Sequence, residues 1–394
     1  MRMGFSRGNM IIRALARWSE RGTYSGRDPT DETFISGAQQ SPESDEPSRK
    51  PQANQIKAKH RVMRAIKHVA IAFVFFCVVG IAMNAALNEI RPNPLRPSWK
   101  VLEAASDPGI NVIFFGSSHI EYGFVPPVFD AALQAHGITG LRSYNLGQGD
   151  ASMLESFADS EDLFRLRPRG VKFVVFEPIL MTSLLSRYTD TLRAIRYYSL
   201  SHAWWSLVPW HVKQAPPAQY LANIGTAVLR HYFGIGLAWA KPDPRGDATQ
   251  GFPDLDPLVH QRMTDSQSWD DEVAAAANAV PQPDFFNKRE LHLVLSFASE
   301  IVAHGAVPIV VAPPSSNDWP VDIIAWLDRN CAGQLPLRFD LFSPKKYPEL
   351  WAPENRFNSD HLNINGAKIF SRLLAEQFRA AIDDNAISRP LCKD

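Results

Sequence analysis

The chain has few cysteines and no excess of charge of either sign, and both facts limit what it can be. Its 394 residues include only three cysteines, too few for a disulfide-built scaffold, and none forms the Cys-x-x-Cys spacing of a structural zinc site. Basic and acidic residues both number 41, so a strongly basic, nucleic-acid-binding protein has little support. Hydrophobic residues make up 45% of the chain, which excludes global disorder.

Motifs for metals and dinucleotides are also missing. The histidines show no His-x-x-x-His or cysteine pairing suited to a metal, so no metal site is expected. Residues 147–150 (GQGD) lack the third glycine of a dinucleotide-binding loop, so no cofactor is expected either.

One long apolar run lies in the first quarter of the chain. Residues 69–83 (VAIAFVFFCVVGIAM) contain no charge and no proline, and extension to residue 87 gives nearly the roughly 20 residues that span a hydrocarbon core. Basic residues crowd its N-terminal side, and a proline-rich stretch follows it. We therefore expect a single-pass membrane helix at 67–90, with the N-terminus cytoplasmic and the rest exported. The alternative is a buried core helix.

The flanks of this run differ from each other. Residues 1–66 are polar and lack a sustained apolar period, so they are expected to form a disordered cytoplasmic tail. Residues 91–105 are expected to be a linker. In the predicted topology Cys331 and Cys392 face an oxidising compartment, where a disulfide between them is one outcome.

Beyond residue 105 short apolar runs alternate with longer helical stretches. Five runs are expected as strands: 111–115, 141–146, 171–176, 306–312 and 337–342. Five stretches are expected as helices: 126–136, 151–165, 286–304, 319–330 and 365–382. This alternation predicts an α/β domain over 106–384, with a parallel sheet of about five strands covered on both faces. Residues 182–285 interrupt it as a helical insertion, which is either a lid or polymer-binding wall over the sheet or a plain helical subdomain.

Two short segments at element boundaries have residues suited to nucleophilic catalysis. Ser117 and Ser118 follow the first expected strand, and His361 precedes the last expected helix. A serine hydroxyl is a weak nucleophile until a base such as histidine removes its proton. Parallel sheets bind ligands beyond the carboxyl ends of their strands, so one crevice is expected to collect such residues.

These segments resemble a known superfamily. FFGSSHIEYGFVPPVFD (114–130), SYNLGQG (143–149) and NSDHLNINGAKIFS (358–371) are similar to the first, second and last blocks of the SGNH (GDSL-type) hydrolases. The similarity is greatest to the membrane-anchored branch that includes lipoteichoic-acid D-alanylation and exopolysaccharide O-acetylation proteins. It covers roughly residues 110–180 and 290–382 and implies a flavodoxin-like, three-layer α/β/α fold.

The resemblance also implies roles for individual residues. The nucleophile falls on Ser118 and the base on His361. The backbone N–H groups of Ser118 and Gly147 would stabilise the oxyanion, with Asn145 and Ser117 as further candidates for this site.

Two positions depart from the family pattern. Asn358 stands where the family usually has the aspartate that orients the base, and Asp360 is the nearest carboxylate, so either is a candidate for that role. The asparagine of the third block is absent, and Glu177 stands after the third strand instead. His119, next to the proposed nucleophile, is expected to point away from it and to serve packing.

The expected function is acyl-ester hydrolysis or O-acyl transfer on an envelope or exported polysaccharide, outside the cytoplasm. The expected partners are the lipid bilayer, that polymer and a membrane-bound acyl exporter, with no nucleic acid. Two alternatives stay open: a catalytically inactive scaffold or glycan-binding component of an envelope assembly, and an esterase acting on lipids at the bilayer surface.

Overall fold

The computed structural model describes part of the chain, in eleven segments. These are residues 50–90, 97–179, 196–197, 225–226, 229, 231, 250–253, 256–263, 267–281, 288–315 and 319–392.

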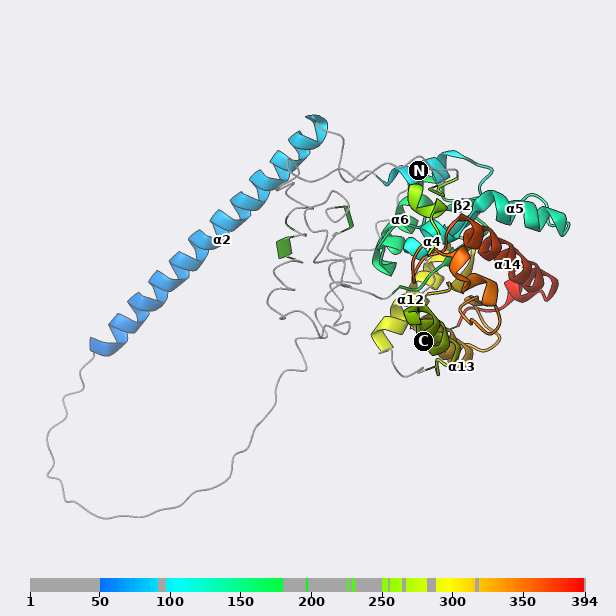
Figure 1. Cartoon of the computed structure of the whole chain (residues 1–394). Helices are drawn as coiled ribbons and strands as arrows, with labels where there is room; N and C mark the ends of the chain where they lie inside the picture. Colours follow the sequence, from blue (N-terminus) through cyan, green and yellow to red (C-terminus); the bar gives the residue numbers. More distant parts are fainter. Residues whose placement is uncertain are drawn as a thin grey trace, which may run out of the picture. The chain divides into compact units, whose positions relative to one another are not determined.

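A single long helix, α2 (Lys50–Ile90), contains the apolar run (Figure 1). Within the described residues, Val62–Met83 is the one stretch that is both helical and apolar over a length sufficient to cross a membrane. Its large side chains, Phe73 and Phe75 among them, are exposed rather than packed in a core, which argues against a buried core helix. The helix begins well before residue 67, so the basic flank is helical and the expected disorder of the tail does not extend to it; residues 1–49 lie outside the described residues.

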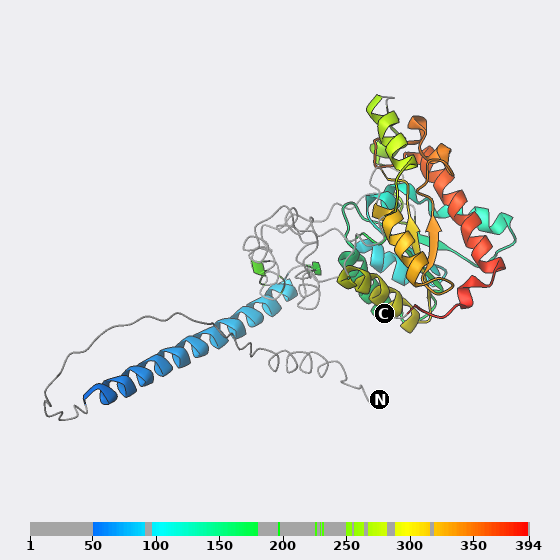
Figure 2. The same ribbon diagram turned by 90° about the horizontal axis from the view of Figure 1, so that it is seen from below.

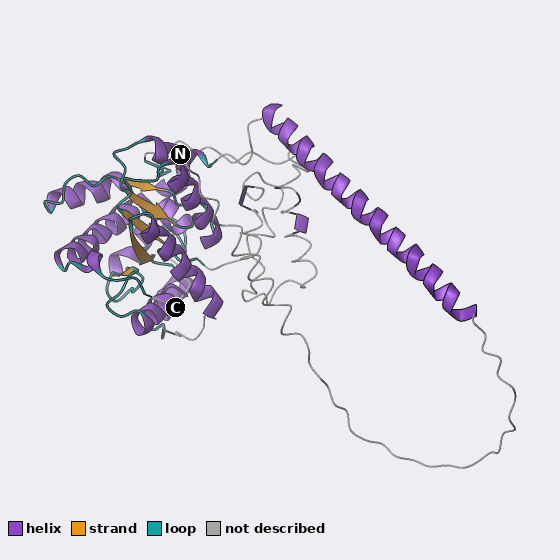
Figure 3. Cartoon of the chain, turned by 180° about the vertical axis from the view of Figure 1, so that it is seen from behind, coloured by secondary structure: helices purple, strands orange, loops and turns teal. Residues whose placement is uncertain are grey.

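Five strands form one parallel sheet, as the apolar runs predict (Figure 3). Each strand lies within its expected run: β1 (Val112–Phe115), β2 (Ser143–Asn145), β3 (Phe173–Phe176), β4 (Val307–Ala312) and β5 (Leu337–Asp340). Their order is β2-β1-β3-β4-β5, and all four neighbouring pairs are parallel. The α/β class and the number of strands are therefore confirmed.

The five expected helices are present, with ends shifted by at most a few residues. They are α5 (Pro126–Ala135), α6 (Met153–Leu166), α12 (Lys288–Ala303), α13 (Trp319–Asn330) and α14 (Ile364–Asp383). Two shorter helices were not expected: α3 (Trp99–Ser106) and α4 (Ser118–Gly123). Helix α11 (Gln267–Ala277) lies within the expected helical insertion. Short 3-10 turns add η1 (Pro257–His260), η2 (Pro348–Leu350), η3 (Pro353–Asn355) and η4 (Ala386–Ser388).

Helix α3 corrects the expected linker at 91–105. Ser98 caps it by accepting a hydrogen bond from the backbone N–H of Val101, and its buried face packs against α6. The capping signal at Ser98 is weak in the sequence, because a proline-rich stretch precedes it and only two turns of helix follow it.

Successive residues of β1 point to opposite faces of the sheet, where different helices meet them. Phe114 contacts Phe129 of α5, with ring centroids 5.3 Å apart, and Phe115 contacts Phe297 of α12 at 6.0 Å. Helix α14, red in Figure 2, packs against α5 on the first of these faces, where Phe378 meets Phe129 at 5.7 Å. Burial on both faces explains why β1, β3 and β4 are nearly continuous apolar runs, whereas β5 alternates buried and partly exposed residues.

Most of the expected helical insertion, whether lid, polymer-binding wall or plain subdomain, lies outside the described residues. Its described parts contact the sheet domain. The backbone N–H of Asn145 donates to the carbonyl of Gln250 (2.9 Å), and Trp269 of α11 stacks on Trp351 at 5.7 Å. Gly251 has a φ of +84°, and a Cβ there would lie 2.0 Å from the carbonyl oxygen of Asn145, so only glycine fits this close approach.

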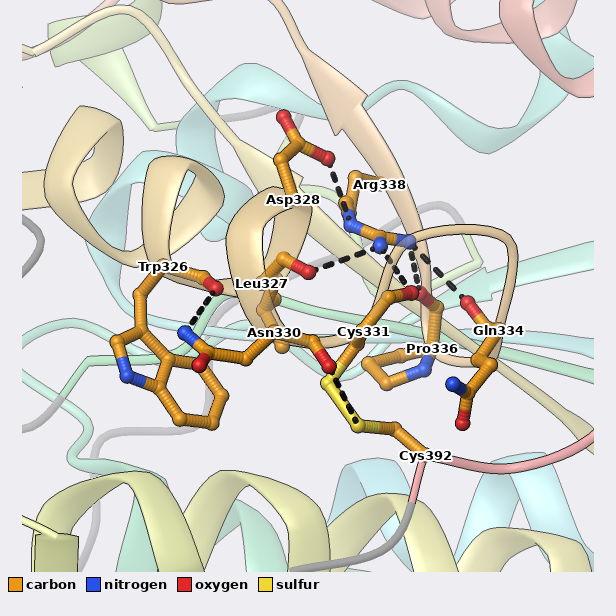
Figure 4. The surroundings of a disulfide bond; sticks show 9 residues. All are labelled: Trp326, Leu327, Asp328, Asn330, Cys331, Gln334, Pro336, Arg338 and Cys392. Atoms are coloured by element: carbon orange, nitrogen blue, oxygen red, sulfur yellow. Dashed lines mark hydrogen bonds and ion pairs between the residues drawn. A yellow bond between two sulfur atoms is a disulfide. The ribbon is translucent and has the colours of Figure 1, made fainter.

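Cys331 and Cys392 form a disulfide, one of the outcomes left open by the sequence (Figure 4). It joins the end of α13 to the C-terminal segment, with Cα atoms 5.4 Å apart across a sequence separation of 61. The segment also pairs with residue 335, because the N–H of Cys392 donates to the Leu335 carbonyl at 2.9 Å. The bond therefore fixes the C-terminal end of the described chain to the edge of the domain.

Candidate active site

The site lies where the order of the strands reverses. Strands β1 and β3 are neighbours, and the chain leaves β1 for β2 on one side of this pair and leaves β3 for β4 on the other. Such a switch point opens a crevice at the carboxyl ends of the strands, which is where ligands bind in open α/β sheets. The turn after β1 bears Ser118, and the first residue after β3 is Glu177.

The turn after β1 needs its glycine. A Cβ at Gly116 would lie 2.3 Å from Cγ1 of Ile120 and 2.8 Å from a carboxylate oxygen of Glu177, too close for any side chain. Ser117 then caps α4, since its Oγ accepts a hydrogen bond from the N–H of His119 at 3.1 Å. Ser118 is thereby the first residue of the helix and lies half-buried at the strand end.

The loop before α14 holds the second half of the site. Arg356 and Leu362 form an isolated antiparallel bridge that closes the loop around residues 357–361. Asn363 caps α14 by accepting hydrogen bonds from the N–H groups of Asn365 (3.0 Å) and Gly366 (3.2 Å). His361 is presented from this closed loop, just before the cap.

Ser118 and His361 meet, although 243 residues separate them. The Ser118 hydroxyl lies 2.7 Å from Nε2 of His361, and Nδ1 of His361 lies 2.9 Å from Oδ1 of Asn358. The expectation that serine and histidine lie within hydrogen-bonding distance is confirmed. A nucleophile, a base and an orienting group follow one another here in the arrangement that acyl transfer uses.

Two backbone donors identify the Asn358 atom as the amide oxygen. Oδ1 also accepts hydrogen bonds from the backbone N–H groups of Asp360 (3.0 Å) and His361 (2.8 Å), which an NH₂ group could not do. Nδ1 of the imidazole must therefore donate its proton to Asn358, and Nε2 is left with a lone pair facing Ser118. This is the tautomer that a general base requires.

Asp360 does not hydrogen-bond to the His361 imidazole. Both ring nitrogens of His361 are occupied, by Ser118 and by Asn358, and the charge of Asp360 acts on the ring from a longer distance. The geometry thus favours Asn358 over Asp360 as the orienting residue.

The pKa of His361 is lowered from 6.5 to about 4, chiefly by burial and then by the positive charges of His119 and Arg356. The charge of Asp360 acts in the opposite direction. Aromatic rings enclose the imidazole: Phe357 stacks on it at 5.2 Å, and Tyr122 meets it edge-on at 5.8 Å. His361 is consequently neutral, and able to accept a proton, over the whole neutral range.

This lowered pKa predicts the acid side of the pH profile. Because the base must be neutral, activity is lost as pH falls through its folded-state pKa. We expect kcat/KM for an uncharged ester to stay level from neutral pH down to about pH 5, and to reach half near pH 4. Circular dichroism at each pH would confirm that the fold persists, and half-loss near pH 6.5 would contradict the assigned environment.

Arg356 is a buried cation beneath the histidine loop. It is 0% exposed and lies between the rings of Trp269 and Trp351, at 5.0 and 5.2 Å from their centroids. Burial lowers its pKa to about 10, still leaving it charged at neutral pH. Its guanidinium donates to two carbonyl oxygens of the loop, those of Asn358 (3.3 Å) and Ser359 (2.6 Å), and to the carbonyl of Leu350 at the end of η2 (3.0 Å). It therefore fixes the backbone from which Asn358 and His361 project.

The expected oxyanion donors from the second block are engaged elsewhere. The N–H of Gly147 donates to Oδ1 of Asn145 at 2.8 Å, and the Asn145 amide donates in turn to the carbonyl of Phe124 at 2.8 Å. Asn145 thus ties β2 to the end of α4, and this arrangement does not direct it or Gly147 N–H to a substrate. Lys100 holds the other side of Gly147, donating to its carbonyl at 2.6 Å.

Ser117 and His119 differ from expectation in a related way. Both the N–H and the hydroxyl of Ser117 donate to Oε2 of Glu177 at 2.9 Å, so neither is directed at a substrate. His119 does not point away to serve packing. Its Nδ1 lies 2.7 Å from Oε1 of Glu177, and its ring centroid is 5.4 Å from that of His361.

The sequence contained one usable signal for this cluster. Glu177 directly follows a buried strand, and a carboxylate at that position needs a polar partner. Arg356 had no comparable signal, because nothing in its sequence surroundings distinguishes a buried arginine from an exposed one. Within the described residues, no group of three or more His, Cys, Asp or Glu side chains is arranged to hold a metal ion.

Comparison of the chain with protein-family models and with curated proteins finds no match. The resemblance to SGNH hydrolases therefore rests on the three motifs and remains a prediction.

Proposed function

We propose that this protein is a membrane-anchored, SGNH-like acyl-ester hydrolase or O-acyltransferase that acts outside the cytoplasm on an envelope or exported polysaccharide. One observation supports the chemistry above all others: the continuous path from Ser118 through His361 to Asn358, with contacts of 2.7 and 2.9 Å. It supplies the nucleophile, the neutral base and the tautomer that acyl transfer needs.

The reaction follows from these contacts. Ser118 Oγ attacks the ester carbonyl carbon as its proton passes to Nε2 of His361, and Asn358 holds the imidazolium through Nδ1–H. The tetrahedral intermediate then expels the alcohol, which takes the proton from His361 and leaves an acyl-serine. Water or a sugar hydroxyl repeats the sequence in reverse, giving hydrolysis or transfer respectively.

The strand order supports the finer fold assignment. The order β2-β1-β3-β4-β5 is the one found in flavodoxin-like doubly wound folds. Together with helices on both faces of β1, it favours the three-layer α/β/α arrangement that the SGNH resemblance implies.

Two independent features support export of the α/β domain. Basic residues precede the apolar part of α2, which by the positive-inside bias keeps the N-terminus in the cytoplasm. The disulfide between Cys331 and Cys392 lies on the other side of α2 in the sequence, and such bonds persist in oxidising compartments. The polysaccharide and an acyl-exporting membrane protein are the partners that fit this location.

A reporter fusion tests the topology. An enzyme that is active only after export should be active when fused after residue 394 and inactive when fused before residue 1, because α2 is the one candidate span among the described residues. The reverse pattern would place the domain in the cytoplasm and remove the envelope substrate from the proposal.

A fluorophosphonate probe tests the chemistry directly, because it reacts with an activated serine without requiring the natural substrate. We expect the full-length protein to be labelled and Ser118→Ala not to be. A folded wild-type protein that resists the probe would support the second candidate function, a catalytically inactive scaffold or glycan-binding component. The hydrogen bond that takes the Gly147 N–H favours that alternative, because it removes one oxyanion donor.

A series of p-nitrophenyl esters of increasing chain length would separate an acetyl-specific enzyme from a lipid esterase.

A further inference from the structure

A second imidazole lies beside the proposed catalytic one. His119 directly follows Ser118 in α4, and its ring is 5.4 Å from that of His361, with a tilt of 30° between the planes. Its side chain is 12% exposed, so it is largely shielded from bulk solvent. The reaction described above gives it no part.

Glu177 favours the cationic form of this imidazole. The carboxylate side chain is 0% exposed, and a buried negative charge is stable only when hydrogen bonds and a positive partner compensate it. Ser117 supplies two hydrogen bonds at 2.9 Å, and His119 is the partner at 2.7 Å.

The charges around His119 act in both directions. Burial by itself lowers the pKa of His119, but the charge and hydrogen bond of Glu177, aided by Asp360, outweigh burial and raise it. Arg356 opposes the positive charge of His119, and a proton on His361 would oppose it as well. The ion pair with Glu177 is the contact that decides the balance.

The charge state determines what Nε2 of His119 can do. In the imidazolium both nitrogens carry a proton: Nδ1–H donates to Glu177, and Nε2–H has no acceptor among the described residues. On deprotonation the remaining proton stays on Nδ1, where the carboxylate holds it, and Nε2 becomes an acceptor. Nε2 is therefore a donor only while His119 is protonated.

The tetrahedral intermediate needs such a donor. Negative charge develops on the former carbonyl oxygen and must be met by hydrogen bonds that are already in place. The N–H of Ser118 has no acceptor among the described residues, but the N–H of Gly147 is held by Asn145. One donor is fewer than such sites generally use.

We propose that His119, held as an imidazolium by Glu177, is a catalytic residue whose Nε2–H stabilises the oxyanion formed when Ser118 attacks an ester. The inference rests on the proposed function. As the bond from Ser118 Oγ to the carbonyl carbon forms, the proton of Ser118 moves to His361, and the π electrons of the carbonyl move to its oxygen. That oxygen accepts hydrogen bonds from Ser118 N–H and His119 Nε2–H. His119 donates without giving up its proton, and the oxyanion collapses to expel the alcohol.

The test uses the full-length protein in detergent micelles with p-nitrophenyl acetate as the probe, comparing His119→Ala, His119→Gln and, as a matched control, His136→Gln. His136 is exposed at the end of α5. Loss of one oxyanion donor lowers kcat by about 10²–10³-fold, and we expect this for His119→Ala, with a smaller loss for His119→Gln, which keeps an N–H donor. His136→Gln should match the wild type.

A pH profile separates catalysis from a structural role. The wild-type kcat/KM should fall on the alkaline side as His119 loses its proton, and this alkaline limb should be absent in His119→Gln. A limb that survives in His119→Gln, or a folded His119→Ala with kcat within threefold of wild type, would overturn the inference. Should His119→Ala not fold, the wild-type and His119→Gln profiles decide alone. Wild-type protein that neither hydrolyses the probe nor labels at Ser118 removes the proposed function and this inference together, whereas an active enzyme indifferent to His119 removes only the inference.

Discussion

Ser118→Ala is expected to lower kcat for ester hydrolysis by about 10⁴-fold or more, and His361→Ala to lower it by a similar factor. The two side chains lie 2.7 Å apart and act as a single proton-transfer unit in the proposed mechanism, so loss of either one should stop the attack. For the same reason the double variant should be scarcely worse than either single variant, as is usual for residues that act together. Steady-state kinetics with p-nitrophenyl acetate measure all three.

Matched surface substitutions control for these variants. Ser106, at the exposed end of α3, and His136, at the end of α5, lie on other parts of the domain. Ser106→Ala and His136→Ala should therefore retain wild-type rates. If Ser118→Ala kept more than about a tenth of the activity, the serine would not be the nucleophile, whatever its distance from His361.

The elements of the sheet domain could be predicted because burial governs their sequences. Strands β1, β3 and β4 are apolar runs, and each long helix repeats its buried positions at helical spacing. Helix α4 could not be found in this way. It has six residues, and it forms because Ser117 caps it and Gly116 lets the chain turn against Glu177. Those two conditions are contacts in space that the local sequence does not display.

The site was predictable only in part, for a similar reason. The pairing of Ser118 with His361 followed from their positions at element boundaries and from the motif resemblance. The partners of the individual hydrogen bonds did not follow from either. Gly147 was expected to donate to a substrate, yet its N–H lies closest to the side chain of Asn145, two residues away. His119 was assigned to packing on the assumption that it continues a strand, whereas it begins a helical turn that directs it to Glu177.

The identity of the orienting residue yields the second large prediction, Asn358→Ala. This substitution removes the acceptor that holds Nδ1–H, so the imidazole can rotate or take the wrong tautomer. We expect kcat to fall by about 10²-fold or more, compared with less than about tenfold for Asp360→Ala, whose carboxylate does not bond to the ring. Steady-state kinetics on both variants measure the difference, with the rate of Ser118→Ala taken as the background rate.

Asn358→Ala also removes the acceptor for two backbone N–H groups of the loop, so a lost contact with the ring must be separated from a loosened loop. Asn358→Asp makes that separation, because its carboxylate keeps every acceptor and adds a charge. It should preserve or raise kcat, and it should move the acid limb of kcat/KM above pH 4, because a neighbouring carboxylate favours the imidazolium and raises the pKa of His361.

An unshifted limb in Asn358→Asp would mean that the side chain supports the loop without orienting the base. A greater loss in Asp360→Ala than in Asn358→Ala would reverse the assignment, and equal, negligible losses would mean that the closed loop alone, fixed by Arg356, holds His361 in place.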